Sequence, residues 1–503
     1  MPAKHTLTTA QRRFFRRINR AVFTNPFSDR RIALDIQISG VAADTPAAKR
    51  LAAVIAAVRQ AVADLDRRKP VGLSDFKGVD QRLLRNVLLF DFFHRFIEPF
   101  DQLILDQIAA EGPPLKVGFA PEAFRYLGRR GFRNSEIQRY FEFCFQLRRA
   151  YFFIDQNLVG RSPCMRELRR KLWNNVFTHD LDLYQRYLWN RMEDFTTLLL
   201  GATGTGKGTA ATAIGRSGLI PFDPANNRFA ESFTRSFIPL NLSQFSEALI
   251  ESELFGHTKG AFTGAVEDFQ GVLSRCSPHG AIFLDEIGEV TEPVQIKLLE
   301  VLQERTFTPV GSHRIQRFQG RVIAATNRSA TEISGPGGLR DDFYYRLCSD
   351  IITIPTLHCR IQEDPGELDD LLALLIERLL GQPSAELTHW VRERIDEQLG
   401  STYPWPGNVR ELAQCVRRLL LNRRYTPREE RTAPDLAARL SRGLQAGTLP
   451  VQELLGGYCH LLHQRLGAYE KVGRRIGLDR RTVKKYIDAW QAGDPENYYS
   501  NQK

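Results

Sequence analysis

The chain has 503 residues, of which 43% are hydrophobic and 25% are charged. This balance excludes a disordered chain, and the length predicts about three domains. The net charge of +11 favours an anionic partner such as nucleic acid, although ordinary soluble proteins also carry such a charge. The seven cysteines lack zinc-binding and disulfide-framework spacings, so we expect reduced thiols and a cytoplasmic location. No apolar run approaches the ~18 residues of a membrane span, so we expect no membrane contact.

Residues 1–160 are expected to form a mainly helical domain. RLLRNVLLFDFFHRFIEPFDQLILDQIAA has apolar residues at helical spacing, and a Gly-Pro-Pro break separates it from a second helical stretch, SEIQRYFEFCFQLRRAYFF. The Arg-rich QRRFFRRINRAVF superficially resembles a transit peptide, but it lacks serine enrichment, which favours a basic amphipathic helix. This domain contains no chemical motif. Binding of a partner, binding of a ligand, contact with the rest of the chain and oligomerisation therefore all stay open as its role.

The pattern changes at about residue 161. Between residues 161 and 361, the short apolar runs TTLLL, FIPLNL, AIFLDE and RVIAATN alternate with helical segments, which predicts an α/β fold with a mainly parallel sheet. Residues 362–425 return to a helical pattern and are expected to form a helical lid. Residues 426–452 form a polar linker in this interpretation, and residues 453–503 form a small all-helical domain rich in Lys and Arg.

The segment TTLLLGATGTGKGTAATAIG is typical of a strand, a phosphate-binding glycine loop and a helix. Backbone N–H groups of such a loop surround phosphates at a helix N-terminus, and Lys207 would reach the outer phosphates. Gly208 stands where these motifs usually place a Mg²⁺-binding Ser or Thr, and Thr209 follows it. An ordinary tight turn between strand and helix is the alternative. The predicted nucleotide-binding residues of this segment are Gly201, Gly204, Gly206, Lys207, Gly208 and Thr209.

The segment GAIFLDEIGEV is an apolar strand that delivers two carboxylates, Asp285 and Glu286, to its end. In this Walker B arrangement, Asp285 would hold Mg²⁺ and Glu286 would orient or deprotonate the attacking water. An ordinary strand followed by an acidic turn is less favoured because the glycine loop lies upstream. Phosphoryl transfer also needs cations for the developing charge, and GLRDDFYYRL offers Arg340 and Arg346.

Residues 161–425 resemble the AAA+ ATPase domain of bacterial enhancer-binding proteins, the activators of sigma-54 RNA polymerase. The segments ESELFGHTKGAFTGA, FLDEIGE, ATNR, DDFYYRL and YPWPGNVREL resemble family signatures and occur in the family's order. The resemblance implies ATP and Mg²⁺ as cofactors, and arginines that act on a neighbouring subunit imply a ring, a hexamer. The implied roles are the Walker A lysine at Lys207, the Walker B pair at Asp285 and Glu286, restraint of the catalytic glutamate by Asn241, sensor I at Asn327, arginine fingers at Arg340 and Arg346, and sensor II at Arg410.

The resemblance also explains an aromatic residue placed on a glycine loop. The family uses the GAFTGA loop as a nucleotide-driven finger that touches sigma-54, with Phe262 and Thr263 here at its tip. Flanking glycines would let the loop rise and fold back when the γ-phosphate is lost. Packing of Phe262 into its own domain is the alternative. The implied contact residues are Gly260, Ala261, Phe262, Thr263, Gly264 and Ala265.

The chain departs from the family pattern in several places. GATGTGKG replaces the common GESGTGKE, so Gly208 stands in place of Glu, and IPTLHCR keeps only Arg360 of two usual arginines. NLSQF replaces Asn-Cys-Ala-Ala-Leu, and the stretch from Leu168 to Thr197 is longer than usual. The catalytic residues remain, so we expect an active ATPase. A DNA-binding regulator or repressor with little ATP turnover is the alternative, and an AAA+ remodeller of another protein is the third.

The segment YEKVGRRIGLDRRTVKKYIDAW has the pattern helix, turn, helix, with a break at Gly477 and a capping residue at Asp479. It also resembles the Fis-type motif that ends many enhancer-binding proteins, so we expect double-stranded DNA upstream of a promoter as a partner. A merely solvated charged helix is the alternative. The predicted core is Val472, Ile476, Leu478, Val483 and Ile487, and the predicted DNA-binding residues are Arg480, Arg481, Thr482, Lys484 and Lys485.

Overall fold

The computed structural model describes residues 5–67, 70–335, 337–427, 440, 441, 444, 447 and 449–492. It divides into two compact units, Met1–Arg424 and Tyr425–Lys503. The predicted linker, residues 426–452, lies for the most part outside the described residues. Within the described part of the chain, no helix is both long enough and apolar enough to cross a membrane.

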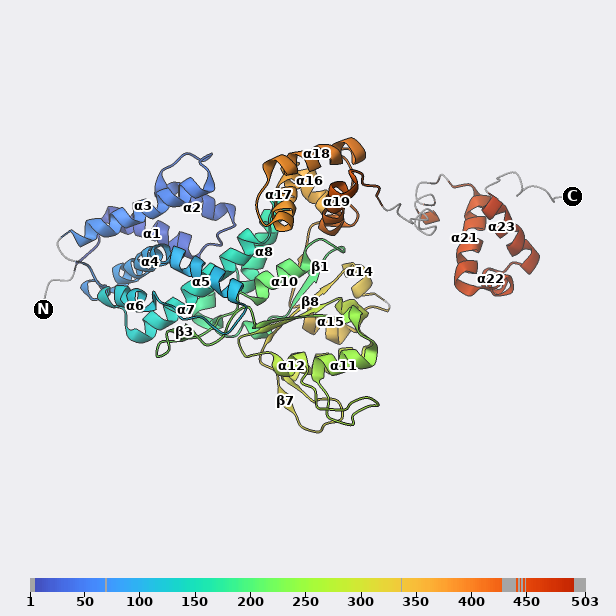
Figure 1. Ribbon diagram of the computed structural model, residues 1–503, viewed down its shortest axis with the longest axis horizontal. Helices are drawn as coiled ribbons and strands as arrows, with labels where there is room; N and C mark the ends of the chain where they lie inside the picture. The colour runs from blue at the N-terminus through green and yellow to red at the C-terminus, as the bar shows by residue number, and fades with distance from the viewer. Residues whose placement is uncertain are drawn as a thin grey trace. The chain divides into compact units, whose positions relative to one another are not determined.

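The centre of the first unit is a five-stranded parallel sheet (Figure 1). The strand order is β4-β5-β8-β1-β9, and every neighbouring pair is parallel. The predicted α/β fold is therefore confirmed, and each of the four strand-like runs forms a strand; the fifth strand was not predicted. The strands are β1 (Thr197–Leu200), β4 (Phe237–Asn241), β5 (Ala281–Asp285), β8 (Arg321–Thr326) and β9 (Asp350–Thr353).

Helices cover both faces of this sheet. Alternate residues of β1 and β5 belong to different hydrophobic clusters: Leu199 and Phe283 pack on one face, and Leu198 and Leu284 on the other. The elements around the sheet are α10 (Lys207–Gly215), α11 (Glu247–Phe255), α12 (Val272–Arg275), α13 (Glu292–Glu304), α14 (Ala330–Ile333), α15 (Asp341–Leu347) and the hairpins β2–β3 (Phe222–Asp223, Arg228–Phe229) and β6–β7 (Thr306–Phe307, Gln316–Arg317).

Four further helices follow the sheet, as the helical pattern predicts. They form the orange cluster of Figure 1. A buried ion pair between Arg360 and Glu367 joins the first two of them, with Nη2 and Oε2 2.6 Å apart. The four helices are α16 (Leu357–Glu363), α17 (Gly366–Leu380), α18 (Ala385–Leu399) and α19 (Asn408–Asn422).

The N-terminal part of the first unit is helical, as predicted. The long apolar stretch forms two helices and not one, because Pro99 lies in the first turn of α5, where its missing N–H costs nothing, whereas in a helix interior it would break the hydrogen-bond ladder. The helices are α1 (Thr9–Phe23), α2 (Asp29–Ser39), α3 (Ala47–Asp66), α4 (Gly78–Arg95), α5 (Ile97–Ala110), α6 (Ala120–Arg129), α7 (Asn134–Tyr151), α8 (Pro163–Phe177) and α9 (Leu181–Leu183).

These helices and one face of the sheet share one hydrophobic core. Phe141 of α7 packs against the rings of Phe222 and Phe229 in the β2–β3 hairpin, at centroid distances of 4.8 and 5.9 Å. Figure 1 shows α8 beside α10, the helix that follows the glycine loop. Buried Arg149 of α7 donates to the carbonyls of Arg216 and Gly218, which directly follow α10. The N-terminal helices are thus attached to the helix that begins at Lys207.

The second unit contains three described helices: α21 (Val451–Leu466), α22 (Tyr469–Ile476) and α23 (Arg480–Ala492). Cys459, Val472, Val483 and Ile487 are fully buried between them, and the predicted Ile476 and Leu478 pack against this core. The predicted core positions are therefore confirmed, whereas Cys459 of α21 was not predicted. Gly477, with φ +73°, ends α22, and the Asp479 side chain accepts N–H bonds from Arg481 and Thr482 at the start of α23.

Candidate nucleotide site, surface loop and basic helix

The glycine loop lies between β1 and α10. Gly204 and Gly206 have φ of +81° and +104°, which favours glycine because a side chain at such φ clashes with the backbone. A Cβ at Gly204 would also lie only 2.4 Å from the carbonyl oxygen of Gly407. Lys207 is buried at the first position of α10, and its Nζ donates to the Gly201 carbonyl at 2.8 Å. Burial lowers the pKa of Lys207, and the negative charges of Glu286 and Asp285 oppose that shift.

The two residues after Lys207 lie on the first turn of α10, with Gly208 exposed and Thr209 partly buried. Gly208 is exposed, and a Cβ built there meets only a ring atom of Phe283, at 4.0 Å. The fold therefore leaves room for a side chain at this position, and the glycine is not required by close packing. Thr209 follows on the same first turn of α10.

The two carboxylates lie at the end of β5. Glu286 has a left-handed φ of +58°, which is uncommon for a residue with a side chain and is often found at functional sites. Its Oε2 accepts a hydrogen bond from the backbone N–H of Asn327, at 3.2 Å. Asp285 Oδ1 accepts from the N–H of Glu286, at 3.1 Å. The predicted sensor residue Asn327 thus contacts the predicted catalytic glutamate through its main chain.

Asn241 lies beside the Asp285–Glu286 pair, but its side chain binds Ser243. The register of β4 and β5 places Asn241 opposite Asp285. Its Oδ1 accepts from both the N–H and the hydroxyl of Ser243, at 3.0 and 2.8 Å, and so caps the short turn that follows β4. In the described structure the carboxylate of Glu286 is held by Asn327, whereas the resemblance assigns that role to Asn241.

The helical lid meets the glycine loop at the start of α19. Asn408 is almost fully buried; its Nδ2 donates to the Thr203 carbonyl at 3.1 Å, and its Oδ1 accepts from the N–H of Leu357 at 2.8 Å. The N–H of Val409 donates to the Gly204 carbonyl, and Arg410 follows it as an exposed residue. Asn408 was not among the predicted site residues. Its position before a helix, within the quoted YPWPGNVREL, is the signal that could have identified it.

The two candidate finger arginines lie on and just before α15 and bind groups of their own chain. Arg340 pairs with Glu292 and with Asp342, and these hydrogen bonds raise its pKa above the usual range for arginine. Arg346 donates twice to the carbonyl of Leu302, at 2.9 and 2.7 Å. Both residues are only partly buried, and the Arg340 side chain is 37% exposed.

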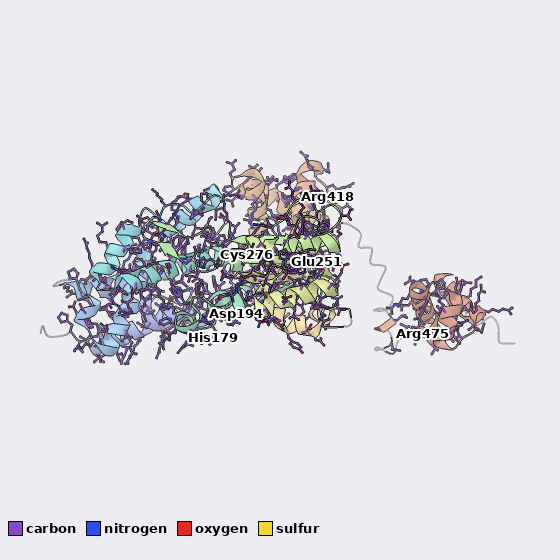
Figure 2. The ribbon with its side chains drawn as sticks, turned by 90° about the horizontal axis from the view of Figure 1, so that it is seen from below. His179, Asp194, Glu251, Cys276, Arg418 and Arg475 are labelled. Carbon is purple, nitrogen blue, oxygen red and sulfur yellow. The ribbon has the colours of Figure 1, made fainter. Side chains whose placement is uncertain are left out.

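The GAFTGA loop follows α11 and forms a turn of its own. Its two glycines, Gly260 and Gly264, have φ of +82° and +103° with no neighbouring atom where a side chain would lie. The N–H of Gly260 donates to the carbonyl of Ala265, which closes the turn at 2.9 Å. Phe262 is 37% exposed and packs edge-on against the His257 ring, while Thr263 is exposed. At the base, Glu251, labelled in Figure 2, pairs with Lys297 of α13 at 2.7 Å.

The basic residues of the second unit lie on an exposed helix face. Arg480, Arg481, Lys484 and Lys485 are all exposed on α23, and Thr482 is partly buried. Arg475 of α22, labelled in Figure 2, is also exposed. The core residues Val483 and Ile487 face the opposite way, so α23 is amphipathic, with one apolar and one basic face.

Comparison with known proteins assigns a class to the central region. Residues 180–353 match the family model described as the sigma-54 interaction domain. The Nif-specific regulatory protein of Azotobacter vinelandii is 38% identical over 271 residues, which are 54% of this chain and 45% of that protein. Transcriptional regulatory protein GlrR of Escherichia coli K12 is 38% identical over 272 residues, 53% of this chain and 56% of that protein. DNA-binding transcriptional regulator NtrC of Azospirillum brasilense is 35% identical over 268 residues, 52% of this chain and 47% of that protein.

Residues 180–353 therefore resemble the sigma-54 interaction domain, which belongs to an AAA+ family, and over this region the chain is similar to these transcription regulators. The chain spans about half the length of the relatives that it matches. Among solved structures, NtrX from Brucella abortus in complex with ADP aligns with 74% of this chain and 80% of its own, at 19% identity and a TM-score of 0.39, a likeness too weak to define the fold.

Proposed function

We propose that this protein is an ATP-driven transcription activator that binds upstream DNA and remodels sigma-54 RNA polymerase. The observation that carries the proposal is the GAFTGA loop, which stands on the same α/β domain as the glycine loop and the Asp285–Glu286 pair, inside a segment that matches the sigma-54 interaction domain. Residues 161–361 would be the nucleotide-binding part, residues 362–425 the lid, and residues 453–503 the DNA-binding domain.

The chemistry proposed for the site is hydrolysis of ATP. Backbone groups of the glycine loop and Lys207 would hold the phosphates, and Arg410 of the lid would approach them because α19 begins against Gly204. Asp285 and Thr209 fit Mg²⁺, which prefers oxygen ligands and would neutralise charge on the phosphates. Glu286 would orient or deprotonate the attacking water.

The proposed assembly is a ring, a hexamer, with the nucleotide between subunits. Arg340 and Arg346 are partly buried and bind groups of their own chain, and they would exchange those partners for the phosphates of a neighbour. An arginine finger supplied by another subunit stabilises the charge that develops on the phosphates. Loss of the γ-phosphate would then change the position of the GAFTGA loop, whose glycine φ values permit movement.

The proposed DNA contact is the basic face of α23. The exposed basic helix α23 is positioned by the turn that Asp479 caps and by the separate hydrophobic core of α21 to α23. Such a helix suits the major groove of DNA. Such a protein would act in the cytoplasm.

The first test is ATP hydrolysis by the full chain over a range of protein concentrations, with Glu286→Gln beside the wild type. Turnover should rise cooperatively with concentration and fall about 100-fold or more in the variant, because the general base is removed. Glu289→Gln, a change of the same type in the next turn, is the matched control and should retain turnover. A wild type without turnover at any concentration would favour the alternative, a DNA-binding regulator that only binds nucleotide.

The second test addresses the polymerase. Thr263→Ala should reduce open-complex formation by sigma-54 RNA polymerase far more than it reduces ATP hydrolysis, because the change lies at the exposed tip of the loop. Val266→Ala is the matched control, since Val266 is 72% exposed just beyond the same loop. Open complexes that are indifferent to Thr263→Ala would support a remodeller of another protein.

A further inference from the structure

A large arginine-lined cleft lies in the N-terminal helical part, outside the site described above. It has a volume of about 1160 Å³ and is lined by residues of α1, α2, α4, α7, α8 and the segment 179–186. Pockets for small ligands usually have volumes of about 300–1,000 Å³, so this cleft is large enough for a molecule of nucleotide size. His179, labelled in Figure 2, lines it.

The charge of this cleft is strongly positive. Seven arginines and two aspartates line it. Three of the arginines, Arg20, Arg30 and Arg82, are exposed to solvent and come from three different helices. Within the described residues, the guanidinium groups of these three arginines have no carboxylate or carbonyl partner. A group of uncompensated positive charges around one hollow attracts an anion and repels a cation.

The other four arginines are held in place by groups of the protein. Arg85 pairs with Glu136, Arg170 with Glu167, and Arg186 with Asp182, which is one of the two aspartates of the cleft. The fourth, Arg139, donates to the carbonyl of Gln185 and lies over the ring of Trp189, 4.5 Å from its centroid. These contacts pre-position guanidinium groups at the wall, which lowers the entropy cost of binding an anion there.

The walls also offer apolar and amide groups. Phe23 and Tyr140 line the cleft, and aromatic rings of this kind can contact the organic part of a ligand. Asn19 and Asn86 are fixed by hydrogen bonds, since Asn86 Nδ2 donates to Asn19 Oδ1 at 2.6 Å and Asn19 Nδ2 donates to the Leu83 carbonyl at 3.1 Å. A second basic groove along α1 continues from the cleft, shares Arg20 with it and adds Arg13 and Arg16.

From this arrangement we infer that the N-terminal helical part binds a small phosphorylated metabolite of nucleotide size in the arginine-lined cleft. Arginine is suited to this task because its planar guanidinium group donates paired hydrogen bonds to phosphate oxygens. The ligand would contact α1, α2 and α4 on one side and α8 with the segment 179–186 on the other. The segment 179–186 is followed, after residues 187–196, by β1, and Asn175 of α8 donates to Thr197 Oγ1 in that strand at 2.9 Å. A bound anion would thus fix the segment that leads into the nucleotide-binding sheet.

The test uses the full chain with Lys207→Ala, so that the glycine loop does not compete for phosphates. Inorganic tripolyphosphate is titrated and its binding is followed by calorimetry and by the fluorescence of Trp189, which contacts Arg139 of the cleft. We expect saturable binding of one tripolyphosphate per chain. The triple change Arg20→Ala, Arg30→Ala, Arg82→Ala should weaken it about tenfold or more, because charge-assisted hydrogen bonds are lost.

The matched control is the double change Arg125→Ala, Arg129→Ala, which removes exposed arginines of α6 that do not line the cleft. This control should bind as the parent does. Binding that is absent, or that is weakened equally by control and cleft variants, would overturn the inference, since the attraction would then be general. Displacement of tripolyphosphate by a DNA duplex, in a chain that also carries Lys484→Ala and Lys485→Ala, would overturn it in favour of nucleic acid.

Discussion

Two helical regions flank the five-stranded sheet in sequence, and they are stabilised in opposite ways. The N-terminal helices share one hydrophobic core with a face of the sheet, and buried Arg149 binds the carbonyls that follow α10. The C-terminal helices α21 to α23 have a separate core of four fully buried residues. A helical part that shares its core with the sheet is expected to lose structure together with the sheet, whereas a part with its own core is expected to unfold independently.

The largest expected effect comes from removal of a ring in the shared core. Phe141→Ala should lower the free energy of unfolding of the first unit by about 3–5 kcal/mol, because Phe141 is fully buried against Phe222 and Phe229. Guanidinium unfolding followed by circular dichroism measures the loss. Phe195→Ala, at a ring that is 39% exposed, is the control and should have a much smaller effect. Equal losses in the two variants would disprove a shared core.

The corresponding change in the separate core of α21 to α23 should destabilise only the second unit. Ile487→Ala should destabilise the three-helix unit by about 2–5 kcal/mol, because Ile487 is fully buried there. Calorimetry should show a lower melting temperature for this unit and an unchanged transition for the first unit. The control is Leu466→Ala, at an α21 residue that is 36% exposed. A shift of both transitions would mean that the units are not independent.

A smaller effect is expected from the buried arginine that connects α7 to the end of α10. Arg149→Met keeps a long side chain between the rings of Phe145 and Phe233 but leaves the Arg216 and Gly218 carbonyls without their donor, at a cost of about 1–3 kcal/mol. Hydrogen–deuterium exchange should rise in α10.

The neighbouring Arg148→Met provides the control for that experiment. Arg148 pairs with Asp101 of α5, so its loss stays within the N-terminal helices and should leave exchange in α10 as it was. Unchanged exchange in Arg149→Met would argue against a connection between the N-terminal helices and the glycine-loop helix.

The smallest predicted effect is a pH dependence of the N-terminal helices. Burial alone would raise the pKa of Glu136, but Arg133 and Arg85 outweigh it and lower that pKa to about 2. Because the folded-state pKa lies below the ordinary 4.5, the stabilisation is complete above pH 4.5 and is lost as the pH falls towards 2. Melting temperatures should therefore fall less steeply with acid in Glu136→Gln than in the wild type. Glu470→Gln, which breaks the exposed pair with Arg474, should leave the slope unchanged.

The sequence by itself determined the local elements of this protein. Short sequence patterns predicted four strands, the glycine loop, the Asp285–Glu286 strand end and the turn at Gly477. This is possible because apolar spacing and glycine positions depend directly on local backbone geometry. Three of the four fully buried residues of the C-terminal helices, Val472, Val483 and Ile487, were also predictable, because they lie within a few turns of one another; Cys459 of α21 was not predicted.

Only the tertiary structure decided which distant groups meet. Three contacts join segments that are far apart in the chain. They are the packing of rings around Phe141, the hydrogen bond from Asn327 to Glu286, and the contact of Asn408 with the glycine loop. The arginine-lined cleft is likewise formed by residues from six segments of the chain. Periodicity predicts which side of a helix is buried, but the partner of that side is fixed by packing of the whole chain.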